Sequence, residues 1–90
     1  MIVARHYVIS GRVQGVGFRF FAEAAAAREG VHGWVRNRPD GAVEAWVEGD
    51  REAVDRVEAA LSRGPSAARV DHVSVEEASP TGRATGFSIR

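Results

Sequence analysis

Two runs of alternating side chains, His32 to Arg38 and Ala42 to Glu48, flank the tripeptide Pro39-Asp40-Gly41. Proline, aspartate and glycine in this order are typical of a type I turn closed by a left-handed glycine, which makes a three-residue hairpin loop. Such a loop fixes the register of its strands, so Arg38 lies opposite Ala42 and every further pair follows. This hairpin constrains the fold more than any other stretch of the chain.

The predicted register places aromatic against aromatic and charge against opposite charge on one face, and mainly apolar side chains on the other. The pairs are Trp34–Trp46 and Arg36–Glu44 on the first face, and Val35–Ala45 and Asn37–Val43 on the second. An aromatic pair and an opposite-charge pair across two strands contribute ~0.2–1 kcal/mol each, and the presence of both in one register supports that register. Asn37 is then the one polar side chain on an apolar face.

The rest of the chain predicts two helices and three further strands. The helices are Phe18 to Glu29, ended by Gly30, and a segment begun by Gly49-Asp50 and ended by Gly64-Pro65. The strands are Arg5 to Ser10, Arg69 to Glu77 and a short Gly86 to Arg90. With right-handed crossovers, the order β-α-β-β-α-β plus a short terminal strand predicts an α+β, ferredoxin-like split βαβ sandwich. Its sheet is expected to be antiparallel, with two helices on one face.

Apolar side chains at regular spacing predict the core. They are Tyr7, Ile9, Phe18, Phe21, Ala22, Ala25, Ala26, Val54, Val57, Leu61, Val73 and Val75. The charged residues of the second helix fall outside this spacing and predict a solvated face.

Composition limits the kinds of partner and compartment. Ninety residues support one domain, residues 1–90, with a single core. Twelve acidic and twelve basic residues balance, which gives no electrostatic basis for a nucleic-acid or membrane partner. There is no cysteine, no signal-peptide pattern and no apolar run near the ~18 residues that span a bilayer. A cytoplasmic monomer is expected.

The segment Gly11 to Arg19 joins the first strand to the first helix and contains three glycines. A glycine-rich loop at a helix N-terminus gathers unpaired amides and the positive end of the helix dipole. This arrangement binds anions, and Arg19 adds a planar charge suited to phosphate. The alternative is an ordinary strand-to-helix turn whose glycines only form the corner.

The usual catalytic groupings are missing from the sequence. The loop lacks the P-loop lysine, and His6, His32 and His72 lie on separate strands without metal-ligand spacing, so no metal or cofactor is expected. An RNA-binding sheet shares the predicted topology, and Trp34 with Trp46 could stack a base. The balanced charge argues against that reading.

The remaining chemistry lies in the loop, Arg19 and Asn37, which the split βαβ topology can bring together. An arginine with a ring of amides can hold a phosphoryl group, and a neutral amide can hold a water for attack. Without a metal or a strong base, such a site needs a good leaving group. Acyl phosphates meet this condition.

The sequence closely resembles the acylphosphatase family. The resemblance rests on Gly11-x-Val13-Gln14-Gly15-Val16-x-Phe18-Arg19, on Gly33-Trp34-Val35-Arg36-Asn37 and on Asp40-Gly41-x-Val43-Glu44. It implies metal-free hydrolysis of a carboxyl-phosphate anhydride to carboxylate and inorganic phosphate. It also implies that Arg19 binds the phosphate with the amides of Gln14, Gly15, Val16, Gly17, Phe18 and Arg19, while Asn37 positions the attacking water.

A domain that binds acyl phosphates without hydrolysing them, or that works only within a larger assembly, is the alternative from another class. The presence of both Arg19 and Asn37 favours the enzyme, because a binding domain has little need for the asparagine. A phosphoglycerate anhydride, carbamoyl phosphate and acetyl phosphate share the phosphoryl end, so the sequence leaves the acyl group open.

Overall fold

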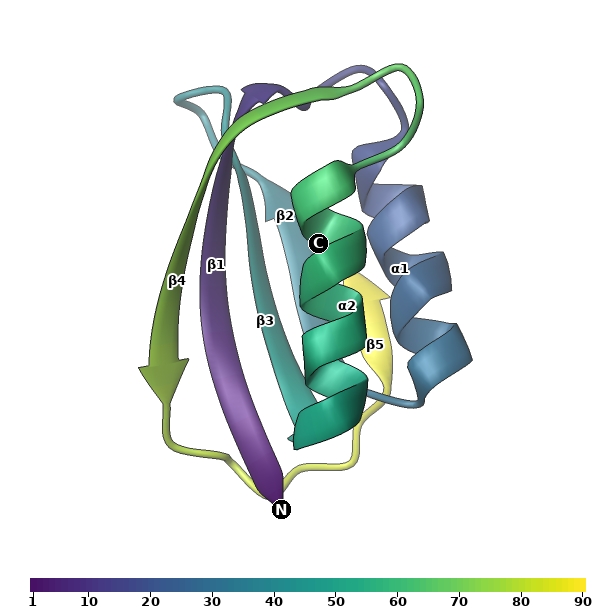
Figure 1. Ribbon diagram of the computed structural model, residues 1–90, viewed down its shortest axis with the longest axis vertical. Coiled ribbons are helices and arrows are strands. Elements are labelled where there is room, and N and C mark those ends of the chain that lie inside the picture. The colour runs from purple at the N-terminus through teal and green to yellow at the C-terminus, as the bar shows by residue number, and fades with distance from the viewer.

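The computed structural model describes residues 1–90 and contains five strands and two helices. They are β1 (Ile2–Arg12), α1 (Phe18–Glu29), β2 (His32–Asn37), β3 (Val43–Asp50), α2 (Arg51–Arg63), β4 (Arg69–Ala78) and β5 (Phe87–Ile89). The strands form one open sheet in the order β4-β1-β3-β2-β5. Both helices lie side by side on one face of this sheet, as Figure 1 shows. The predicted ferredoxin-like split βαβ sandwich is confirmed.

The hairpin of β2 and β3 has the predicted register. Trp34 lies opposite Trp46, and Asn37 lies opposite Val43. The turn is closed by the Arg38 amide, which donates to the Ala42 carbonyl oxygen at 2.8 Å. The Ala42 amide in turn donates to the Asp40 carboxylate at 3.0 Å, which is the role of aspartate in such turns.

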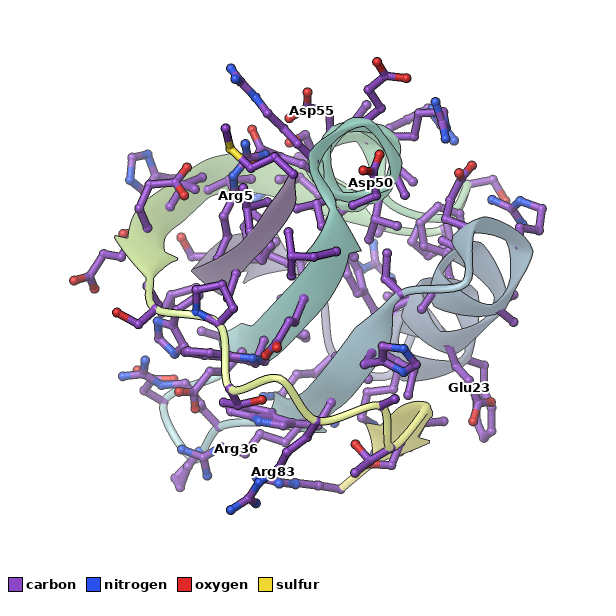
Figure 2. The ribbon with its side chains drawn as sticks, turned by 90° about the horizontal axis from the view of Figure 1, so that it is seen from below. Arg5, Glu23, Arg36, Asp50, Asp55 and Arg83 are labelled. Atoms are coloured by element: carbon purple, nitrogen blue, oxygen red, sulfur yellow. The ribbon has the colours of Figure 1, made fainter.

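The sheet differs from the expected antiparallel sheet at one edge. β1, β2, β3 and β4 pair antiparallel, whereas β5 pairs parallel with β2, so the sheet is mixed. The reason is the connection after β4, residues 79–86, which crosses the face without helices and reaches the opposite edge of the sheet (Figure 2). After this crossing the chain runs in the direction of β2.

A cluster of fifteen buried residues lies between the sheet and the helices. Predicted core residues form most of it, and Val54, Val57 and Leu61 of α2 are buried as their spacing indicates. Val75 was expected to face the core but is 42% exposed. It faces the helix side of the sheet, but β4 is the edge strand, where the helices cover the sheet incompletely.

The charged side of α2 is largely exposed, as its spacing predicted, but two of its carboxylates also bind a buried arginine of β1. Arg5 of β1 is only 8% exposed, and its guanidinium donates to Asp55 at 2.7 Å and to Glu58 at 3.1 Å. Figure 2 shows Arg5 and Asp55 on the same side of the molecule, at the end where α2 begins. Glu77 of β4 accepts a third bond at 2.8 Å, and Tyr7 donates to Glu58 at 2.9 Å. The hydrogen bond with Asp55 raises the pKa of Arg5, so this guanidinium stays charged although it is buried.

Glu48 of β3 anchors the segment that leads to β5. Glu48 is 4% exposed, and its carboxylate accepts hydrogen bonds from the Thr81 hydroxyl and the Gly82 amide, both at 2.8 Å. The Trp46 indole N–H donates to it as well, at 3.3 Å. Burial on its own raises the pKa of Glu48, but the hydrogen bonds from Thr81 and Gly82 outweigh burial and lower this pKa to about 2.

Glu48→Gln is expected to destabilise the protein by ~2 kcal/mol near neutral pH, because a charged acceptor of several hydrogen bonds is lost. The pKa of Glu48 falls from the ordinary 4.5 to about 2 on folding, so its stabilisation is complete above about pH 5 and is lost as the pH falls toward 2. Urea unfolding of wild type and variant should therefore converge in acid. A difference that is constant with pH, or an equal effect of Glu76→Gln at an exposed site on β4, would contradict this assignment.

Candidate active site

The candidate site lies at the end of the molecule where β1 leads into α1 and where β2 ends. In Figure 1 this is the upper end, which also carries the turn between β2 and β3. Residues 13–17 form the loop, and α1 begins at Phe18 as the sequence predicted. The antiparallel pairing through β3 makes β1 and β2 parallel, so both strands end at this edge.

The loop turns its amides outward through two left-handed glycines, Gly15 with φ 73° and Gly17 with φ 77°. Gly17 also caps α1, and no side chain caps this helix end. The amides of residues 14–20 donate to no oxygen of the protein, and the first helical bond runs from the Phe21 amide to the Gly17 carbonyl oxygen. Successive free amides around left-handed residues form an anion-binding nest, which the positive end of the helix dipole strengthens.

A small cleft of about 100 Å³ opens on this loop. Its lining residues are Val13, Gly15, Gly17, Phe18, Arg19, Phe20 and Asn37. Five of them belong to the predicted site, and the lining contains no carboxylate. At about 30 Å³ of liquid volume per water, the cleft has the size of a few waters, which suits a phosphoryl group and little more.

Arg19 brings the only formal charge to the cleft lining. It forms no ion pair with any carboxylate of the protein, unlike Arg5, Arg36 and Arg38. Its one hydrogen bond within the protein runs from Nη1 to the main-chain oxygen of Arg90, at 3.4 Å. Most of the planar donor fork of Arg19 is therefore available to an anion.

Asn37 is the last residue of β2, and its side chain lies on the face of the hairpin that carries Val35, Val43 and Ala45. Those three neighbours are buried, but Asn37 is at the end of the row and reaches the cleft. Its carboxamide makes no hydrogen bond within the protein. A free carboxamide can donate and accept at once, which is what holding a water beside an anion requires.

The family of the chain follows from comparison with known proteins. The model of the acylphosphatase family matches residues 5–89. The chain belongs to the acylphosphatase family. An acylphosphatase of Anaeromyxobacter dehalogenans is 53% identical over 88 residues, which are 98% of this chain and 95% of that protein.

Two solved structures share the whole fold of this chain. The crystal structure of acylphosphatase from Bacillus subtilis superposes with a TM-score of 0.93 at 38% identity and covers 100% of this chain and 99% of its own. HypF from T. kodakarensis is also similar, with a TM-score of 0.84 at 32% identity over 98% of this chain. The match covers only 12% of the HypF chain, so there the same fold is one part of a much larger protein.

Gln14 and Val16 do not line the cleft of this acylphosphatase-family chain. The Gln14 carboxamide donates to the main-chain oxygens of Arg38 at 2.7 Å and of Ala42 at 3.0 Å, so it ties the loop to the hairpin turn. Val16 packs against the core. The prediction assigned substrate binding to the main-chain amides of both residues, and these amides donate to no oxygen of the protein.

Two residues of the cleft, Val13 and Phe20, were not predicted from the sequence as site residues. Val13 is buried and lines the cleft. Its place between two predicted elements gave no sign of this. Phe20 carried a usable signal: it follows Arg19 directly, and it stands outside the apolar stripe of Phe18, Phe21 and Ala22. A large apolar residue outside the buried stripe of a helix must be exposed.

Two of the three histidines have side-chain partners outside the cleft, and His72 is exposed on β4. His6 Nε2 lies 2.6 Å from the Glu44 carboxylate on the open face of the sheet, and His32 Nδ1 accepts a hydrogen bond from the Gly86 amide at 2.9 Å. No group of three or more histidine, aspartate or glutamate side chains is close enough to hold a metal ion. Neither helix is long and apolar enough to cross a bilayer.

Proposed function

We propose that this chain hydrolyses acyl phosphates to a carboxylate and inorganic phosphate, with Arg19 and the loop amides binding the phosphoryl group and Asn37 positioning the water. Membership of the acylphosphatase family supports the reaction. The single observation that carries the residue roles is that Arg19, Asn37 and the free amides of the loop meet in one small cleft without a carboxylate.

The chemistry follows from the donors around the cleft. Arg19 and the amides neutralise charge on the phosphoryl oxygens and hold the phosphorus for in-line attack. The water on Asn37 forms the new bond to phosphorus, the bond from phosphorus to the acyl oxygen breaks, and the proton of the water passes to the phosphate. The carboxylate leaves without a proton, because carboxyl groups have pKa values near ~4. No general acid is needed.

Hydrolysis of benzoyl phosphate, followed by its loss of absorbance on conversion to benzoate, tests this function. The protein is expected to accelerate the reaction strongly over buffer, and the rate should be the same after treatment with a chelator, since Arg19 supplies the charge that a metal would otherwise provide. Folded protein that binds inorganic phosphate without accelerating hydrolysis would support the binding domain instead. A loss of activity with chelator would show that a metal takes part.

We also propose that residues 1–90 act as one domain, as a monomer and in the cytoplasm. The absence of cysteine supports the location, because secreted domains of this size are commonly stabilised by disulfides. We propose no nucleic-acid partner. The charges balance, and the Arg90 guanidinium already covers the Trp34 ring at 4.6 Å from its centroid. Sedimentation at low and high protein concentration tests the monomer.

A further inference from the structure

Phe20 exposes an aromatic ring beside the candidate active site. It is 68% exposed, although it lies in the first turn of α1 directly after Arg19. Met1 and Ile2, which are also large, apolar and exposed, lie at the other end of the molecule, and Val75 lies on the edge strand β4. Phe20 is thus the one large apolar side chain offered to solvent at the phosphate cleft.

Phe20 also lines a second, larger depression. This groove of about 520 Å³ runs between α1 and β5, and its lining includes Phe20, Ala24, Ala27, Val31 and Phe87. The alanines of α1 are small, which leaves the space open. Phe20 is the one residue that lines both the groove and the phosphate cleft, so the two depressions adjoin at this residue.

We propose that the groove between α1 and β5 is the acyl-group subsite, and that it selects acyl phosphates with an aromatic or extended apolar acyl group. The inference rests on the proposed function. A phosphoryl group fills the cleft of about 100 Å³, so the acyl group attached to it must lie outside. Next to the cleft, the exposed ring of Phe20 and the apolar groove behind it offer surface that an apolar acyl group can cover.

Glu23 is a second residue that affects which acyl groups the groove accepts. It lines the groove and forms no ion pair with a cation of the protein. In Figure 2 it projects from the side of α1 that is nearest to β5. An unpaired carboxylate there repels acyl groups that carry a negative charge of their own, so anionic acyl phosphates are disfavoured relative to neutral ones.

Phe20→Ala tests the subsite through the ratio of two substrates. We expect kcat/KM for benzoyl phosphate to fall about 10-fold, because a lost apolar contact of this size discriminates substrates by 10-fold or more. For acetyl phosphate, whose short acyl group cannot extend along the groove, we expect a smaller fall, so that the ratio of kcat/KM for benzoyl phosphate to that for acetyl phosphate decreases several-fold. Ile2→Ala, which removes an exposed apolar side chain at the opposite end, is the matched control and should leave both values unchanged.

Two further variants keep the test independent of Phe20. Ala24→Glu places a charge one helical turn further along the groove and should reduce turnover of benzoyl phosphate but not of acetyl phosphate. Glu23→Gln should raise kcat/KM for succinyl phosphate, whose acyl group carries a carboxylate, and leave acetyl phosphate unchanged.

The possible outcomes distinguish a failure of the proposed acyl subsite from a failure of the proposed function. If Phe20→Ala lowers kcat/KM equally for benzoyl and acetyl phosphate, or lowers neither, the groove is not the acyl subsite, while hydrolysis itself stands. If the wild-type protein hydrolyses no acyl phosphate, the proposed function fails. A wild-type preference for succinyl phosphate over neutral substrates would overturn the role given to Glu23.

Discussion

Replacing Arg19 with alanine is expected to lower kcat/KM for acyl phosphates by about 10³-fold or more, which corresponds to ~4 kcal/mol of transition-state stabilisation. The size follows from the cleft, in which Arg19 supplies the only formal charge that can neutralise the phosphoryl oxygens. Inorganic phosphate should also bind more weakly to the variant, as measured by competitive inhibition of the residual activity or by calorimetry.

The fold should survive this change, because Arg19 makes a single hydrogen bond of 3.4 Å within the protein. Thermal unfolding is therefore expected to shift little. Arg83→Ala is the matched control, since Arg83 is an exposed arginine on the connection across the open sheet face. If Arg19→Ala retains wild-type kcat/KM, or if Arg83→Ala loses as much, Arg19 does not bind the phosphoryl group.

Asn37→Ala is expected to lower kcat by about 10²–10³-fold with little change in KM, by analogy with the removal of one fixed polar group from a reaction centre. The variant still holds the phosphoryl group through Arg19 and the amides, but the water loses its position. Initial rates over a range of benzoyl phosphate concentrations separate the two parameters.

Asn37→Asp provides the contrast to alanine. Its carboxylate keeps the shape of the side chain but brings a negative charge into a cleft that contains none. We expect it to raise KM and the inhibition constant of phosphate as well as to lower kcat. A rise in KM alone for Asn37→Ala would make Asn37 a substrate-binding residue and would require another group to position the water.

Local sequence was sufficient to predict the hairpin and the glycine loop of the candidate site. The turn at Pro39 to Gly41 depends on backbone preferences of three adjacent residues, and the resulting register was confirmed pair by pair from Asn37 to Trp34. The glycine loop and the start of α1 are also local features, and they formed as predicted. That Asn37 and Arg19 share one cleft followed from topology rather than from spacing in the sequence.

The features that were missed depend on partners far apart in the chain. The ion pair between Arg5 and Asp55 joins residues 50 apart, and Glu48 receives its hydrogen bonds from residues 33 and 34 positions away. Charged residues outside an apolar stripe look the same in sequence whether they face water or a buried arginine. The parallel pairing of β5 likewise depends on where residues 79–86 cross the sheet, which no local signal determines.

The register of the β2–β3 hairpin decides on which face of the sheet the Asn37 side chain lies. Asn37 faces the cleft because it is an odd number of residues from Trp34, whose side chain lies on the open face of the sheet. A slip of the pairing by one residue would send the carboxamide to that open face and present Arg36 or Arg38 toward the phosphate. The residues of the turn touch no part of the cleft, yet their number decides which side chain of β2 reaches the cleft.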